Sequence, residues 1–146
     1  MVLFYVTKGG SIVTTTITYK RNRPINAQQL ISVFASSGIK RPIQDVARIQ
    51  KMIDHANLLI TAWDDEKLIG IARCVTDFSY CCYVSDLAVC KEYQQKGIGK
   101  TLLNKIKEEA TDQSAIILLS APSAVEYYPH IGFEQVDVAF RIPRSN

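Results

Sequence analysis

The 146-residue sequence lacks the features that mark several common protein classes. Its longest apolar runs, such as residues 2–6 and 115–119, are far shorter than the roughly 20 residues that a membrane-spanning helix needs. The apolar N-terminus has neither a charged lead nor a small-residue cleavage site, so it predicts no secretory signal. No repeat, low-complexity tract or Pro/Ser-rich linker divides the chain. We therefore expect a single cytoplasmic domain over residues 1–146, outside any membrane.

An excess of one charge and the usual metal-ligand patterns are also missing. Lys and Arg total 17 against 14 Asp and Glu, and the net charge of +3 is not gathered in one block, which argues against a nucleic-acid partner. The sequence has four cysteines: Cys74, Cys81, Cys82 and Cys90. They form no C-x-x-C pair and stand at no zinc-type spacing from a histidine. We expect no metal site, and buried free thiols in a reducing compartment.

Hydrophobic periodicity changes along the chain between the two-residue repeat of strands and the 3.6-residue repeat of helices. Strands are predicted at residues 2–6, 12–19, 58–63, 68–75, 80–89, 115–119 and 135–142. Helices are predicted from about Asn26 to residues 36–38, after Pro42, from Ile98, and from Pro122 to about Tyr128. This order predicts an α/β fold with a mixed sheet.

A glycine loop, QQKGIGK, occupies residues 94–100 between a predicted strand and a predicted helix. Glycines let the backbone turn tightly, so several N–H groups can point at one spot, and the first helical turn adds unpaired donors and a positive dipole end. Lys96 and Lys100 add positive charge. Such a loop is typical of phosphate binding, although a glycine turn that merely begins a helix is the alternative.

Spacing distinguishes three glycine motifs. A dinucleotide fingerprint needs a glycine where Leu102 stands, and a P-loop needs one where Gln94 stands. The remaining pattern, Q/R-x-x-G-x-G/A, is matched in full by Gln94, Gly97 and Gly99.

With this loop, four segments in order resemble the GCN5-related N-acetyltransferase (GNAT) family, which binds acetyl-CoA. They are residues 86–89, 94–99, 115–120 and 127–133, the last of which is similar to the family's F-Y-x-x-x-G-F segment. The resemblance implies the GNAT fold, an α/β domain with a mixed, twisted central sheet flanked by helices. It also implies an acetyl-CoA-dependent N-acetyltransferase that transfers the acetyl group directly to a primary amine.

The resemblance assigns roles to particular residues. The strand edge at residues 87–89 would pair with the pantetheine arm, the N–H of Val89 would polarise the thioester carbonyl, and the amides of residues 95–100 would hold the pyrophosphate. The expected cofactor-binding residues are Leu87, Ala88, Val89, Gln94, Gln95, Lys96, Gly97, Ile98, Gly99, Lys100 and Thr101. Tyr128 stands at the position of the family's usual general acid, where it would protonate the leaving sulfur; the alternative is that it only packs, like Tyr127.

The general base stays open at this point. Some relatives have a Glu where this chain has Tyr83, and strand alternation predicts that Asp86 lies on the face opposite Tyr83 and Leu87. Asp86 is therefore either the base or a structural acid, and a water chain is the third alternative. A second departure from the family is Ala121, where many relatives carry an Asn that contacts the cofactor.

The acceptor is not identified by the sequence. The small chain favours a small-molecule amine over a protein, and fold analogy expects it near residues 36–44 and 77–80. A non-catalytic acetyl-CoA-binding sensor is the alternative function, against which Tyr128 favours an enzyme. The apolar strand at residues 2–6 is expected either to close the sheet edge or to pair with a second copy in a homodimer.

Overall fold

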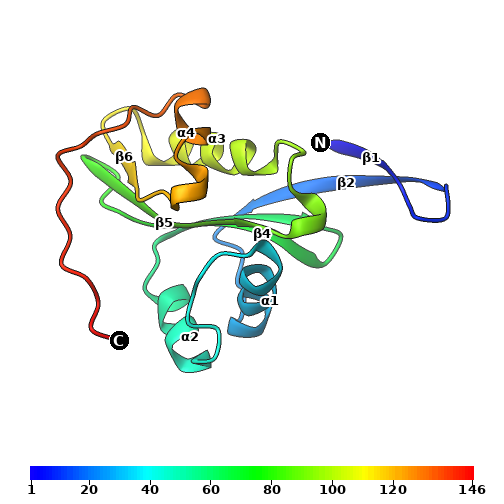
Figure 1. The fold of residues 1–146 in the computed structure, drawn as a ribbon, viewed down its shortest axis with the longest axis horizontal. Helices are drawn as coiled ribbons and strands as arrows, with labels where there is room; N and C mark the ends of the chain where they lie inside the picture. Colours follow the sequence, from blue (N-terminus) through cyan, green and yellow to red (C-terminus); the bar gives the residue numbers. More distant parts are fainter.

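The computed structural model describes residues 1–146, except for the side chain of Tyr5. Six strands form a sheet in the order β1-β2-β3-β4-β5-β6 (Figure 1). Their bounds are β1 Val2–Val6, β2 Ile12–Arg21, β3 Leu58–Asp64, β4 Lys67–Thr76, β5 Cys81–Val89 and β6 Ala115–Leu118. Neighbours from β1 to β5 are antiparallel, and β6 is parallel to β5. The predicted mixed sheet is confirmed.

Helices cover both faces of the sheet. The α-helices are α1 Ala27–Ser37, α2 Val46–Asp54, α3 Ile98–Ala110 and α4 Tyr127–His130, and two 3-10 turns are η1 Lys91–Tyr93 and η2 Pro122–Ala124. Figure 1 shows α1 and α2 on one face, with α3 and α4 on the other. The predicted helix at residues 122–128 is thus divided into η2 and α4.

Local signals explain where the first two helices begin. Asn26 caps α1 in a capping box with Gln29, and Gly38, at φ 83°, ends the helix in the left-handed conformation. The side chain of Asp45 accepts a hydrogen bond from the N–H of Arg48, so α2 begins after Asp45 rather than directly after Pro42.

A β-bulge interrupts the pairing of β4 with β5. Arg73 pairs with Asp86 and Cys74 pairs with Val84, so Ser85 is an extra residue on β5. The prediction that Asp86 and Tyr83 lie on opposite faces is therefore wrong. Their partners, Arg73 and Val75, are two residues apart on β4 and share a face, and the extra residue carries β5 through one additional step of the pleat.

Leu87 does lie on the other face from Asp86, since its partner on β4 is Ala72. The same register places Asp86 on the α1–α2 side, because Arg73 reaches the carbonyl of Met52 in α2. The sheet thus presents Tyr83 and Asp86 on one face and Leu87 on the other.

The predicted strand at residues 135–142 is wrong. The segment is irregular, and its alternating apolar side chains are exposed, with Val138 at 74% and Phe140 at 98%. Alternation shows that a segment can form a half-buried strand, but a strand also needs a backbone partner. Here β6 is a four-residue edge strand, and residues 135–142 run away from it instead of pairing with it (Figure 1).

Other expectations have mixed outcomes. All four cysteines are free, but Cys81 is exposed while Cys74, Cys82 and Cys90 are buried. β1 pairs with β2, and its Phe4 is 71% exposed on a hairpin that extends beyond the helices (Figure 1). No helix in the described part of the chain combines the length and hydrophobicity needed to cross a bilayer.

A substitution at Gly70 of β4 tests the tight packing between the sheet and α3. A Cβ at this position would lie 3.4 Å from the Cβ of Ala62, from the carbonyl oxygen of Ala88 and from Cδ1 of Leu102. Gly70→Val should lower the free energy of unfolding by about 1–3 kcal/mol, because overpacking displaces these neighbours. Urea unfolding measures the loss. Gly9→Val is the control, because a Cβ there meets only Thr7 Oγ1, at 3.9 Å; equal stability of the two variants would contradict the prediction.

Candidate active site

The second half of β5 has an open edge. β6 pairs with β5 only over Cys81–Val84, so residues 85–89 have no strand partner on that side. Two neighbouring strands therefore separate beyond Val84 and Leu118. A strand edge with unpaired N–H and C=O groups is a template for another extended chain or an amide-bearing ligand.

Backbone alternation decides which groups face this edge. The N–H of Cys90 donates to the carbonyl of Ile69 on β4, at 2.8 Å. Backbone groups of every second residue point to the same side of a strand, so those of Ala88 also face β4 and those of Leu87 and Val89 face the open edge. Ala88 is 3% exposed. Of the three strand residues predicted to bind the cofactor, Leu87 and Val89 thus present their backbone and Ala88 does not.

The glycine loop follows β5 directly and leads into α3. Gln95 has φ 60° and Gly97 has φ 79°, both in the left-handed region. α3 begins at Ile98, and no side chain caps its N-terminus at Gly97. The first N–H groups of the helix therefore keep their donor capacity at the positive end of the dipole. The side chain of Ile98 is 1% exposed, so this residue offers its backbone alone.

Several side chains of the loop bind within the protein. The amide of Gln94 donates to the carbonyls of Val89, at 2.8 Å, and Ser37, at 3.3 Å, which ties the loop to the end of β5 and to α1. Lys96 Nζ donates to the carbonyl of Glu92, at 2.8 Å. Thr101 Oγ1 donates to the carbonyl of Gly97, at 3.0 Å. Gln94 and Thr101 therefore shape the loop through their side chains.

The two tyrosines of α4 differ in their surroundings. The hydroxyl of Tyr127 is 3.7 Å from the position of a Cβ on Gly99, so α4 lies over the start of α3. Tyr128 is half-buried, and its ring makes edge contacts with Tyr127 and Phe133 at 5.4 and 5.6 Å between centroids. Burial raises the pKa of Tyr128, and the neighbouring Tyr127 adds to the effect. A phenol with a raised pKa stays protonated at neutral pH, as a proton donor must.

Asp86 is engaged in a buried ion-pair network. It is 1% exposed, and its two oxygens accept hydrogen bonds from Nε of Arg41 and Nε of Arg73, each at 2.5 Å. Arg73 also donates to Ser85 Oγ, at 2.9 Å, and Arg41 donates to the carbonyl of Ser85, at 2.8 Å. Both carboxylate oxygens already have guanidinium partners, which favours the structural acid over the general base.

Sequence reasoning missed Arg41, Arg73 and Ser85. One signal is available in the sequence: Arg73 is the single charged residue within the otherwise apolar run at residues 68–75. A buried arginine needs an acid partner, and Asp86 is the acid of the next strand. The contribution of Arg41 has no such signal, because it comes from an irregular segment between α1 and α2.

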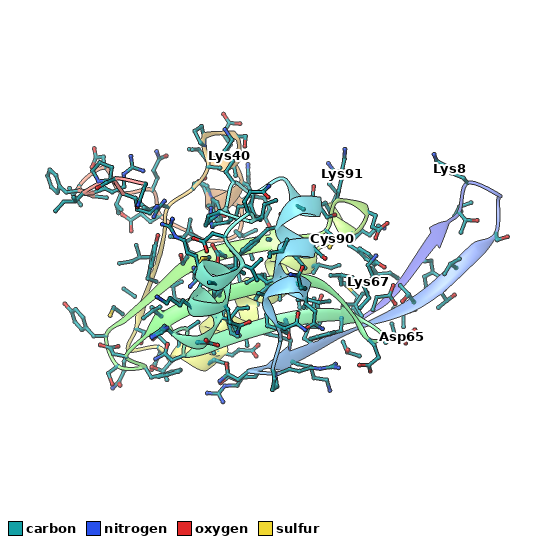
Figure 2. All side chains as sticks on the ribbon, turned by 90° about the horizontal axis from the view of Figure 1, so that it is seen from below. Lys8, Lys40, Asp65, Lys67, Cys90 and Lys91 are labelled. Atoms are coloured by element: carbon teal, nitrogen blue, oxygen red, sulfur yellow. The ribbon has the colours of Figure 1, made fainter. Side chains whose placement is uncertain are left out.

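Two hollows adjoin the ends of β5. One, of about 400 Å³, lies against α1 and the β3–β4 turn; Figure 2 shows Lys67 and Cys90 close together there. Its lining residues are Gln29, Ser32, Ser36, Glu66, Lys67, Leu68, Cys90 and Glu92. The other, of about 310 Å³, is lined by Tyr83, Leu119, Arg141, Ile142, Pro143 and Arg144. No cluster of three metal-ligating side chains occurs among the described residues.

Comparison with known proteins identifies the family. The model of a family described as an acetyltransferase (GNAT) domain matches residues 25–141. The chain belongs to the GNAT family of N-acetyltransferases. An uncharacterized N-acetyltransferase, ycf52, from Gracilaria tenuistipitata var. liui is 29% identical over 133 residues, which cover 88% of this chain and 72% of that protein.

Solved structures share the GNAT fold. A probable acetyltransferase of unknown function from meticillin-resistant Staphylococcus aureus has a TM-score of 0.74 at 20% identity, covering 88% of this chain and 100% of that one. The aminoglycoside N-acetyltransferase AAC(6')-Iy, solved in complex with CoA, has a TM-score of 0.66 at 14% identity, covering 90% and 97%. The predicted family and fold are thus confirmed, and GNAT enzymes use acetyl-CoA.

The network around Asp86 predicts a large loss of stability when its charge is removed. Asp86→Asn leaves two guanidinium groups, one of them buried, without their carboxylate, and should cost about 3–5 kcal/mol of unfolding free energy. The matched control is Glu66→Gln, which breaks the exposed pair with Arg23 and should cost about 0–1 kcal/mol. Chemical denaturation measures both. A loss for Asp86→Asn as small as that of the control would contradict the role of the network.

Proposed function

We propose that this GNAT protein transfers the acetyl group of acetyl-CoA to the amine of a small molecule, with the open edge of β5 as the reaction site. One observation carries the proposal: three features follow one another along the chain. They are a strand edge with no strand partner, a loop with two residues in the left-handed conformation, and a helix N-terminus that no side chain caps. An edge that offers N–H groups suits the amides of a pantetheine arm, and the helix N-terminus suits a pyrophosphate.

The residues present fit acetyl-CoA. When bound, it would supply an activated acetyl group on a thiol that can leave. The backbone of Leu87 and Val89 would hold its extended arm, and the N–H of Val89 would donate to the thioester oxygen as charge develops there. The N–H groups of residues 95–100 would hold the phosphates. Lys100 stands in the first turn of α3 and adds a positive charge at that end.

Tyr128 would donate a proton to the departing sulfur. Its phenol is held by Tyr127 and Phe133, and burial raises its pKa, so it is protonated throughout the neutral range. The amine must lose a proton as it attacks. Since Arg41 and Arg73 engage Asp86, we propose that water carries this proton to solvent.

Replacement of Gly99 tests the cofactor site. Gly99→Leu places a side chain between the loop and α4, where a Cβ alone already lies 3.7 Å from the Tyr127 hydroxyl. The affinity for CoA should fall by about tenfold or more, because the backbone can no longer approach the phosphates. The control is Asn104→Leu, the same side chain on the exposed face of α3. Calorimetry with CoA measures both; unchanged affinity in a folded Gly99→Leu variant would contradict the site.

A pair of tyrosine variants tests the proton donor. Tyr128→Phe removes only the hydroxyl, so acetyl-CoA binding should persist while turnover falls by about a hundredfold, the usual contribution of a general acid. Tyr127→Phe is the matched control, the neighbouring phenol of the same helix, and its turnover should stay close to that of the unmodified protein. Thiol release with acetyl-CoA measures both. Full turnover in Tyr128→Phe would exclude Tyr128 as the donor.

The same assay distinguishes an enzyme from a sensor. Thiol release with a panel of primary amines is expected for the enzyme. Tight binding of acetyl-CoA with no release across amines and peptides would favour a non-catalytic acetyl-CoA sensor instead.

A further inference from the structure

The C-terminal segment, residues 134–146, forms part of the surface next to the open edge. It passes β6 and continues toward α2 on the α1–α2 face (Figure 1). Its last residue is close to α2, where the guanidinium of Arg48 donates to the carbonyl of Asn146, at 3.4 Å. Residues 141–144 of the segment line one hollow together with Tyr83 of β5 and Leu119, which follows β6.

The 310 Å³ hollow described above lies between this segment and the two strands. Tyr83 is two residues before the bulge at Ser85, and Leu119 directly follows the last residue of β6. Tyr83 and Leu119 are exposed, at 41% and 57%, and both line the hollow. The hollow therefore begins where the open edge of β5 begins, on the face that carries Tyr83.

Two arginines supply all the charge of this hollow's lining. Arg141 and Arg144 line it, and no acidic residue does. Among the described residues, the ion pairs of arginine involve Arg21, Arg23, Arg41 and Arg73, so neither Arg141 nor Arg144 has a carboxylate partner. Guanidinium groups bind carboxylates and phosphates in a bidentate geometry, and both of these are free to do so.

We propose that this hollow is the acceptor subsite and that it selects amines which carry an anionic group, a carboxylate or a phosphate, at the end away from the reacting nitrogen. The proposal rests on the acetyl transfer proposed above. Arg141 and Arg144 hold the anion, and Tyr83 and Leu119 contact the carbon chain. The amine then points toward the open edge of β5.

The same charges disfavour another class of acceptor. AAC(6')-Iy is named as an aminoglycoside N-acetyltransferase. Aminoglycosides carry several ammonium groups at neutral pH. Two unpaired guanidinium groups repel such a polycation, and the hollow's lining offers no carboxylate to bind it. On electrostatic grounds, the proposed subsite would therefore take a different class of acceptor from that of this structural relative.

The test uses three amines of similar length that differ in the charge of the far end: 4-aminobutyrate, butylamine and 1,4-diaminobutane. Thiol release with acetyl-CoA gives kcat/KM for each. The anionic amine should exceed the neutral one by about tenfold or more, the effect of one charge-assisted hydrogen bond, and the dicationic amine should be the poorest. O-phosphoethanolamine against ethanolamine repeats the comparison for phosphate and shows which anion the arginines prefer.

Two variants locate the effect. The double variant Arg141→Gln and Arg144→Gln should raise KM for 4-aminobutyrate until its kcat/KM equals that of butylamine, whose own turnover stays unchanged and reports that the variant is folded. The control is Lys8→Gln, which removes a cation at the tip of the β1–β2 hairpin, far from the segment (Figure 2); it should keep the full preference.

The outcomes separate the two proposals. Absence of thiol release with every amine overturns the acetyl transfer and, with it, the acceptor subsite. Release without preference for the anionic amines, or a preference that survives the double variant, overturns the acceptor subsite alone.

Discussion

Asp86 carries a carboxylate at 1% exposure, and guanidinium groups from β4 and from the segment after α1 meet its two oxygens. Burying a charge without a partner costs several kcal/mol. The carboxylate therefore stabilises the positions of Arg41 and Arg73, and the two arginines stabilise the buried carboxylate. Both arginines also bind Ser85, the extra residue of the bulge. These contacts thus hold the bulge, after which the side chains of β5 lie on the opposite faces from those that simple alternation predicts. The open edge begins at the same residue.

The short length of β6 is the second constraint. Its four residues pair with β5 only as far as Val84, which leaves Leu87 and Val89 without a strand partner on that edge. An unpaired edge ordinarily invites aggregation. Here Gln94 crosses its end by donating to the Val89 carbonyl, so the loop limits the edge to a few residues. An edge of this length suits one extended ligand rather than another strand.

Patterns local in the sequence predicted most of the fold. Asn26, Gly38 and the apolar repeats of α3 act through neighbours a few residues away, and the glycine loop has a fixed spacing; these elements appear as expected. The errors involve partners distant in sequence. Residues 135–142 alternate like a strand but have no strand to pair with. The carbonyl of Ser85, the extra residue of the bulge, accepts a hydrogen bond from Arg41, which is 44 residues away in the sequence. Periodicity contains no information about either partner.

The proposed function and the proposed acceptor subsite each use positive charge, and these charges lie at the two ends of the open edge. Tyr83 and Val89 pair with Val75 and Gly70, which are five residues apart on β4, so the two ends of the open edge are separated by about 17 Å at the usual rise of a strand. This separation exceeds the Debye length of about 8 Å at physiological salt, so two anions bound at the two ends repel each other little. Under the two proposals, a protein with a net charge of only +3 binds one anion at each end of the edge. The two proposed ligands, one extending from the helix N-terminus and the other from the arginines, would then meet between the two ends, beside the backbone of Leu87.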